Sequence, residues 1–278
     1  MSSSNPVRAT RVDWNAQAFR NDRNEWALDR VRPLEGEVSA AEWQARVDLA
    51  ACYRLVARYG WDDMLSVHIS ARVPDEEGRF LINPYGLLFS QVTASSLIKV
   101  DSSGKKYSET PFHLNPAAIN IHGGILDVRE DVASVLHLHT NAGVAVSALK
   151  SGLLPINQRS LYFMNIIAYH DYEGIAIEEA ERIGLARDLG DKWVMILRNH
   201  GTLTVGRTVA QAFVYAYFLE RACQYQVQTL SMGAELTPLS QETIDVVPTQ
   251  IGHFEIAGLL EWPALLATLD AEDPSYRN

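Results

Sequence analysis

The sequence predicts an α/β protein in which a central, largely antiparallel sheet is covered by helices on both faces. Three observations support this class. Short apolar or alternating runs, typical of strands, lie between segments with helical periodicity. These strands and helices do not alternate strictly, as they would in a protein built from parallel βαβ units. The chain has 278 residues, of which 47% are hydrophobic, so it is long enough to bury a sizeable core.

The first half of the chain contains two helix starts with clear capping signals. Ser39 and Glu42 form a capping box before an Ala- and Leu-rich pattern, which predicts a helix that ends near Gly60. Asn115 followed by Pro116 predicts a second helix, which should run to about residue 127. Strands are expected between these helices, at 67–72, 80–82 and 97–101, with turns at 83–86 and 102–104.

The second half begins with a partly β-branched apolar run at 133–140, which predicts a buried strand. A small-residue helix should follow at 141–150, and the charged pattern at 178–189 predicts an exposed helix. A second apolar strand starts at Trp193 and runs into an Asn-His-Gly turn at 199–201. A long helix with a wide apolar face is expected at 208–232.

Three segments follow from this pattern. Residues 1–38 are polar and weakly periodic, and we expect an arm that orders on the body of the protein or on a neighbouring subunit. Residues 39–232 should form one domain. Residues 233–278 contain Pro238, Pro248 and Pro263 and are expected to be irregular, with one short helix.

Charge and cysteine content exclude several classes of partner. The formal net charge is −10 and no block of basic residues occurs, so nucleic acid and membrane surfaces are not expected partners. Cys52 and Cys223 are the only cysteines, which predicts neither a disulfide framework nor a thiolate metal site. Neither a signal peptide nor an apolar run long enough to span a membrane is visible, so we expect a cytoplasmic protein.

Three histidines form the most informative pattern. His137 and His139 lie two apart on the predicted strand at 133–140, so both imidazoles should project from the same face. His200 stands at the end of the second apolar strand. If the two strands are neighbours, three imidazoles converge and leave a coordination position open, as a catalytic metal requires. The alternative for each is a core histidine bonded to a backbone carbonyl or an exposed histidine at the edge of the sheet.

Five stretches of the sequence resemble the class II aldolase/adducin family. The match covers about residues 40–232, and the last of the five resembles the adducin-like branch. The stretches are HISAR at 68–72, LINPYGLL at 81–88, VLHLHT at 135–140, LRNHG at 197–201 and AYHDYEG at 168–174.

This resemblance implies a three-layer α/β/α fold and one divalent metal per subunit, held by His137, His139 and His200. Zinc is favoured over iron(II), although imidazole ligands suit both. The resemblance also implies a homotetramer with active sites between subunits, at whose interface the 233–278 tail would pack. In the sugar-phosphate aldolases of the family, the metal polarises a carbonyl of a small-molecule substrate and stabilises the enediolate that forms when a carbon–carbon bond breaks.

The acid/base carboxylate of these aldolases has no counterpart at the matching position. The family Glu lies four residues before a histidine that corresponds to His122, and here that position is Ala118. We expect His122 to act as the acid/base instead. Glu109, four residues before His113, imitates the motif nine residues too early; it is either a substitute carboxylate or a solvated loop residue. His170 is expected to be structural, within a loop.

The phosphate-binding residues of the family are also replaced. His68 stands where the family has Asn, and Tyr85 fills the Asn83-Pro84-Tyr85-Gly86 turn in place of a small hydroxyl residue. A phenol occupies the space through which backbone amides approach an anion. We therefore expect a non-phosphorylated oxo or hydroxy acid, bound by His68, Asn83 and Arg72, with Tyr85 as proton donor or substrate contact. Arg72 equally suits a structural ion pair.

Three functions remain open. The first is a metal-dependent carbon–carbon lyase of the aldolase type. The second is a mononuclear non-haem iron oxygenase acting on an aromatic or oxo acid, which the resemblance admits and which would not need the missing Glu. The third is a non-catalytic scaffold of the adducin kind, although the basic tail of adducin has no counterpart in the acidic 261–273 segment.

Overall fold

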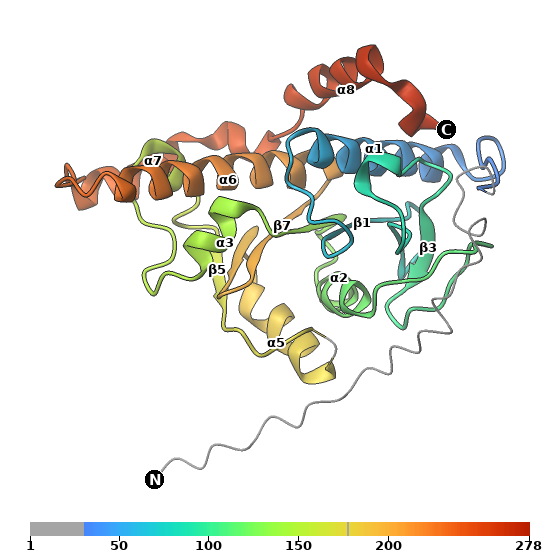
Figure 1. Cartoon of the computed structure of the whole chain (residues 1–278), viewed down its shortest axis with the longest axis horizontal. Helices are drawn as coiled ribbons and strands as arrows, with labels where there is room; N and C mark the ends of the chain where they lie inside the picture. Colours follow the sequence, from blue (N-terminus) through green and yellow to red (C-terminus); the bar gives the residue numbers. More distant parts are fainter. Residues whose placement is uncertain (1–30, 177) are drawn as a thin grey trace, which may run out of the picture.

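A seven-stranded sheet lies at the centre of the computed structural model, which describes residues 31–176 and 178–278 (Figure 1). Its strands run in the order β3-β2-β1-β4-β7-β6-β5. Every neighbouring pair is antiparallel except β5 and β6, which are parallel. The largely antiparallel sheet is therefore confirmed. The strands are β1 (His68–Arg72), β2 (Arg79–Ile82), β3 (Ile98–Asp101), β4 (Ser134–Leu138), β5 (Ile167–His170), β6 (Val194–Leu197) and β7 (Gly201–Gly206).

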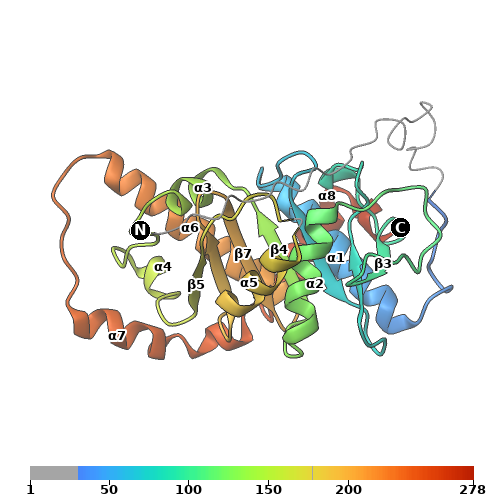
Figure 2. The ribbon, with the colours of Figure 1, turned by 90° about the horizontal axis from the view of Figure 1, so that it is seen from below.

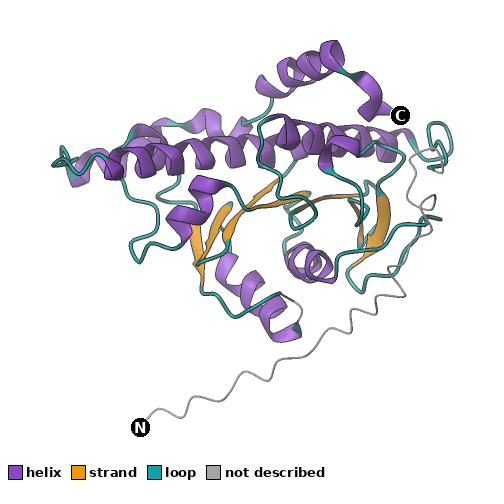
Figure 3. Cartoon of the chain, in the orientation of Figure 1, coloured by secondary structure: helices purple, strands orange, loops and turns teal. Residues whose placement is uncertain are grey.

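Helices cover both faces of this sheet. The helices α1 and α6 lie on one face, whereas α2 and α5 lie on the other (Figures 1 and 3). The expected three layers are thus confirmed. The α-helices are α1 (Ala40–Arg58), α2 (Pro116–Val128), α3 (Asn141–Ser147), α4 (Gln158–Leu161), α5 (Glu179–Leu189), α6 (Val209–Ser231), α7 (Gln241–Gln250) and α8 (Glu261–Glu272). Short 3₁₀ helices are η2 (Phe89–Gln91), η3 (Gly252–Ile256) and η4 (Pro274–Arg277). None of the described helices is long and apolar enough to cross a membrane.

The α1 capping box is only half formed, for an electrostatic reason. The Ser39 hydroxyl accepts a hydrogen bond from the Glu42 amide at 3.1 Å, as a cap should. The Glu42 carboxylate does not return to the cap, because it pairs with Arg46 at 2.8 Å and with Lys99 at 2.6 Å. Arg46 is 1% exposed, and a buried guanidinium needs a counter-charge more than the helix needs a second cap contact.

The start of α2 agrees with the sequence. The Asn115 side chain accepts a hydrogen bond from the Ala117 amide, and Pro116 occupies the first turn. The helix then presents the two small residues Gly123 and Gly124 to its neighbours. An added Cβ at Gly124 would lie 2.6 Å from Arg182 of α5, so the close packing of α2 and α5 depends on glycine at this position.

Two strands and most of the tail structure were not predicted. The 168–174 stretch, expected to be a loop, begins within the edge strand β5, and β7 follows the Asn-His-Gly turn directly. The tail forms two α-helices instead of one (Figure 2). Its last part packs on α1 of the same chain, where Asp48 accepts a hydrogen bond from the Trp262 indole at 2.9 Å and Arg58 pairs with Glu272 at 2.8 Å. Most of the predicted 1–38 arm lies outside the described residues.

Candidate metal centre

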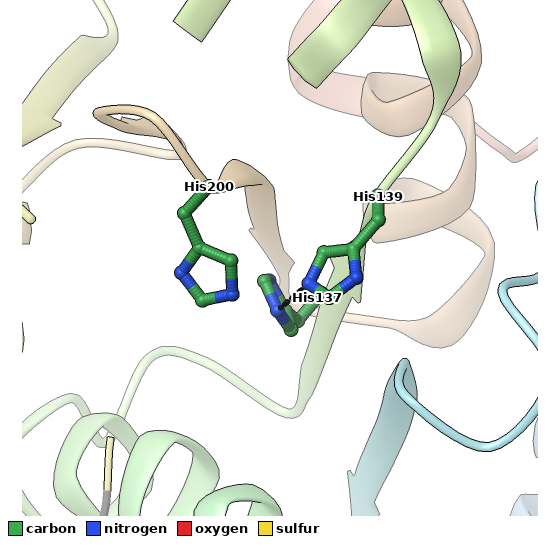
Figure 4. A group of neighbouring side chains, drawn as sticks. All are labelled: His137, His139 and His200. Carbon is green, nitrogen blue, oxygen red and sulfur yellow. Dashed lines mark hydrogen bonds between the residues drawn. The ribbon is translucent and has the colours of Figure 1, made fainter. Parts of the chain in front are cut away.

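Three imidazoles meet at the end of the central strand, β4. The ligand nitrogens of His137, His139 and His200 all lie within 4.8 Å of one another (Figure 4). The ring centroids of His137 are 4.7 Å from those of both other histidines. This is the convergence that the sequence predicted. Among the described residues it is the only group of this kind with metal-ligating potential.

The strand arrangement that places His200 beside His137 and His139 differs from the predicted one. The strand before His200, β6, is not a neighbour of β4, because β7 lies between them. His200 occupies the tight turn between β6 and β7, and β7 pairs with β4 so that Leu138 lies opposite Thr202. The hairpin therefore brings the turn to the end of β4, where His139 follows directly.

Local backbone chemistry holds this turn against β4. Asn199 has a φ of 56°, the left-handed region that asparagine tolerates better than most residues. Gly201 lies so close to β4 that an added Cβ would stand 2.5 Å from the Leu138 carbonyl oxygen and 3.0 Å from the His139 ring. Each residue of the Asn-His-Gly sequence thus has a role in the turn: Asn199 adopts the left-handed conformation, His200 provides the imidazole, and Gly201 allows the close approach to β4.

Hydrogen bonds fix which nitrogen of two rings faces the centre. His137 Nδ1 lies 3.1 Å from the Thr202 carbonyl oxygen, and His139 Nδ1 lies 3.0 Å from the Asp63 carboxylate. Neither oxygen has a hydrogen to give, so in each neutral ring Nδ1 carries the hydrogen and Nε2 has the lone pair. The two Nε2 atoms are 2.9 Å apart. Two lone pairs at this distance are complementary to a shared cation.

Burial keeps the rings of His137 and His200 in the neutral form that a metal requires. It holds the pKa of His137 well below its ordinary value, and the neighbouring imidazoles act in the same direction. Burial, with His139 and His170 nearby, lowers the pKa of His200 to about 4. Protons therefore compete weakly for these nitrogens near neutral pH.

Two further histidines extend the cluster inward. His68 lies opposite His137 in the β1–β4 register, with ring centroids 5.0 Å apart. Its Nδ1 is 2.7 Å from His122 Nε2, and His122 Nδ1 is 2.5 Å from the Ser70 hydroxyl. His122 is fully buried. Its predicted acid/base role would therefore have to pass through His68, since the His122 ring has no access to solvent.

The three other predicted site residues lie in different surroundings. Asn83 is buried, and its side-chain oxygen accepts a hydrogen bond from the Tyr53 hydroxyl at 2.9 Å. Tyr85 is half-buried and forms an isolated antiparallel bridge with His113. Arg72 lies at the end of β1 away from His68, where its guanidinium donates to backbone carbonyls at 126, 129 and 132. These contacts favour the structural alternative for Arg72, with carbonyl oxygens as partners in place of a carboxylate.

The structure supplies no substitute for the missing carboxylate from the expected positions. Ala118 is fully buried within the main hydrophobic core. Glu109 lines a separate cavity of about 440 Å³ together with Arg46 and Lys99, and this cavity contains none of the three metal-site histidines. The imitation motif at Glu109 and His113 is therefore not part of the cluster.

Two residues beside the centre escaped the sequence analysis. Asp63 orients His139, yet it stands 76 residues earlier in a loop after α1, and no spacing pattern connects the two. Tyr172 is 54% exposed and its ring centroid lies 6.0 Å from that of His200. Tyr172 lies in the 168–174 stretch that resembles the adducin-like branch, but within that stretch a role was predicted only for His170.

Comparisons with known proteins agree with this fold. The family described as Class II Aldolase and Adducin N-terminal domain matches residues 47–227. A protein of Caulobacter vibrioides, provisionally named an aldolase class 2 protein, is 54% identical over 245 residues, covering 87% of this chain and 95% of that protein. The structure of L-fuculose 1-phosphate aldolase from Glaciozyma antarctica has a TM-score of 0.76 at 27% identity, covering 88% of this chain and 95% of that one.

An adducin is also similar. Alpha-adducin of Rattus norvegicus is 45% identical over 208 residues, which are 72% of this chain but only 28% of the adducin. The chain therefore corresponds to one part of that longer protein. Since the family match covers most of the domain that carries the three histidines, the chain belongs to the class II aldolase and adducin N-terminal domain family.

Proposed function

We propose that the protein is a metal-dependent enzyme of the class II aldolase type. It would act as a carbon–carbon lyase on a small, non-phosphorylated oxo or hydroxy acid. The observation that carries this proposal is the pair of Nε2 atoms of His137 and His139, which face each other at 2.9 Å with His200 beside them. Three neutral imidazoles with a carboxylate and a carbonyl behind two of them match the donor set of a catalytic zinc site.

The three histidines would hold one divalent ion, and zinc is proposed over iron(II) because no carboxylate joins the ligand group in the described residues. A bound ion would supply Lewis-acid polarisation of a substrate carbonyl. The protein itself contributes orientation. Thr202 and Asp63 fix the tautomers of His137 and His139, so that the lone pairs point into the site before any ion arrives.

The proposed substrate class rests on two replaced positions. His68 is 2% exposed and bonded to His122, so its ring fills the space that a small polar residue would leave for an anion. Tyr85 adds a phenol at the adjoining turn. A carboxylate is smaller and less charged than a phosphate, and a site with less room and few cations suits it better. Tyr172 would provide an aromatic wall next to His200.

A homotetramer is proposed on the resemblance to the aldolases of the family and on exposed apolar residues near the end of α6. Leu230 is 41% exposed and Met232 is 70% exposed, and α7 has no buried residue. Surfaces of this kind are typical of protein contacts. The predicted packing of the 233–278 tail against a second subunit remains a prediction.

The similarity to alpha-adducin favours a second candidate, a non-catalytic adducin-like protein. The identity with that adducin, 45%, exceeds the 27% found with the fuculose-phosphate aldolase. The two candidates differ in turnover, since only the enzyme converts a substrate when metal is bound.

Metal analysis combined with a substrate panel tests the proposal. Wild-type protein should hold about one zinc per subunit and should cleave at least one aliphatic or aromatic oxo or hydroxy acid without consuming oxygen. The variant His139→Ala should lose both metal and activity, whereas His113→Ala, outside the cluster, should retain both. Metal retained by His139→Ala would refute the three-histidine site. Bound metal without turnover on any acid would favour the adducin-like candidate, and substrate-dependent oxygen uptake with iron would indicate an oxygenase.

A further inference from the structure

His170 has a buried ring nitrogen that the proposed function does not use. The residue ends strand β5 and is 3% exposed. Its Nδ1 lies 2.7 Å from the Asp188 carboxylate of α5. Its Nε2 is buried and has no hydrogen-bond partner among the described residues. A buried polar atom without a partner is rare enough in folded proteins to need an explanation.

The tautomer of His170 follows from its carboxylate partner. The guanidinium of Arg187 and the ring of His170 hold the pKa of the Asp188 carboxyl below its ordinary value. Asp188 is therefore ionised near neutral pH and can only accept a hydrogen bond, so His170 Nδ1 donates it. In the neutral ring, Nε2 then has a lone pair and seeks a donor.

His170 also lines a small cavity. Its volume is about 10 Å³, close to the least space that a single water molecule needs. His170, Glu181, Tyr172 and the metal-site residue His200 all line it. Glu181 is 6% exposed, and burial raises the pKa of its carboxyl. The cavity thus has room for one water and is lined by residues with polar side chains.

His200 is the metal-site histidine whose outer nitrogen lacks a protein partner. His137 and His139 each have an oxygen acceptor behind the ring, but no side-chain hydrogen bond of His200 occurs in the described part of the chain. In Figure 4 one nitrogen of the His200 ring faces the other two imidazoles, and the second faces away from them. When the facing nitrogen has the lone pair, the second carries a hydrogen.

We propose that one water molecule occupies this cavity and connects the outer N–H of His200 to His170 Nε2. The water accepts a hydrogen bond from His200 and donates one to His170, whose Nδ1–H in turn is held by Asp188. His170 and Asp188 are thereby positioning residues for a metal ligand, and the inference rests on the proposed metal centre. It gives His200 the outer partner that Asp63 and Thr202 give the other two histidines.

Two substitutions at His170 separate its two nitrogens. The amide of asparagine lies as many bonds from Cα as Nδ1, so His170→Asn keeps a partner for Asp188 and loses the group at Nε2. The amide of glutamine lies as many bonds from Cα as Nε2, so His170→Gln keeps a polar atom facing the cavity. Arg187→Gln is the matched control, because Arg187 binds the other oxygen of the same Asp188 carboxylate at 2.8 Å.

The dissociation constant for zinc, measured on the full chain by competition with a chromophoric chelator, decides the proposal. We expect about a ten-fold increase for His170→Asn, as is usual when an outer partner of a metal ligand is lost, a smaller increase for His170→Gln, and none for Arg187→Gln. A constant unchanged in His170→Asn, or an equal loss in Arg187→Gln, overturns it. If His170→Asn does not fold, the partly exposed Asp188 provides the test. The variant Asp188→Asn should then increase the dissociation constant for zinc several-fold.

Different results would refute the proposed metal centre itself. If wild-type protein binds no zinc, or if His139→Ala binds it as tightly as wild type, the three-histidine site is wrong. If those two results are as expected and His170→Asn matches wild type, only the water-mediated link is wrong. A crystal structure of the zinc-loaded protein provides a direct check: it should show a water within hydrogen-bonding distance of His170 Nε2 and His200, and a dry cavity would overturn the link.

Discussion

The buried imidazoles behind the metal site predict that the free energy of unfolding decreases as the pH falls below neutral. Burial lowers the pKa of His122 to about 3 in the folded protein, whereas an unfolded histidine titrates near pH 6.5. As the pH falls below about 6.5, the unfolded state takes up a proton that the folded state refuses. The contribution of His122 to stability is therefore full above the unfolded pKa and is lost as the pH falls towards the folded one.

The size of the effect follows from these two pKa values. From about pH 7 to about pH 5, the loss integrates to about 2 kcal/mol for this one ring. That is a large share of the 5–15 kcal/mol by which domains are usually stable. His68 and His137 add to the effect, because burial holds the pKa of each well below its ordinary value.

Urea unfolding of chelator-treated protein at a series of pH values measures this directly. The slope of unfolding free energy against pH gives the difference in bound protons between the unfolded and folded states. In His122→Asn, that difference should fall by about one proton near pH 5.5. The control Ile121→Val, at a neighbouring buried position on α2, should lower stability by about 1 kcal/mol and leave the slope unchanged. Equal slopes in wild type and His122→Asn would refute the reasoning.

Three other perturbations test the surroundings of the site and the fold. Asp63→Asn should weaken zinc binding about ten-fold, because His139 loses the partner that orients its ring. Competition with a chelator measures this, and the control Asp62→Asn should leave zinc binding unchanged. Equal effects of the two variants would show that Asp63 does not orient His139. Gly201→Ala should cost about 1–3 kcal/mol and reduce metal content, because the added Cβ would stand 2.5 Å from the Leu138 carbonyl; unchanged thermal unfolding would contradict this. Glu42→Ala should cost about 3–5 kcal/mol, since it removes the carboxylate that pairs with the buried Arg46. A loss below 1 kcal/mol in urea unfolding would show that the Ala94 and Leu97 carbonyls are sufficient partners for Arg46.

The helix boundaries illustrate what local sequence can predict. The Asn115-Pro116 start of α2 was visible as a pattern and occurs as expected, and α6 lies within the predicted range 208–232, with Thr208 as its cap. Both depend on contacts within one turn of the chain, so neighbouring residues contain the information. The Glu42 carboxylate shows the limit, because its partners Arg46 and Lys99 were decided by burial in the folded protein rather than by the capping pattern.

The strands that were missed depend on pairing. The run Gly201–Gly206 contains four glycine or threonine residues and only two apolar ones, and no strand was predicted for it. It becomes β7 because it fills the sheet between β4 and β6. In the same way Ile167–His170 is a strand because it pairs in parallel with β6. A segment with low strand propensity can thus form a strand because the neighbouring strands of the sheet pair with it.

The sequence by itself determined the sheet-and-helix class, the caps of the main helices and the shared face of His137 and His139, because a period of two residues fixes side-chain direction along any strand. Only the tertiary structure decided that His200 joins them from a hairpin turn and that Asp63 lies behind His139. It also decided that Arg72 binds carbonyls at the end of α2, and that His170 and His200 line one water-sized cavity. These contacts join residues that are far apart in the chain. The order of the strands creates them, and no local pattern contains that order.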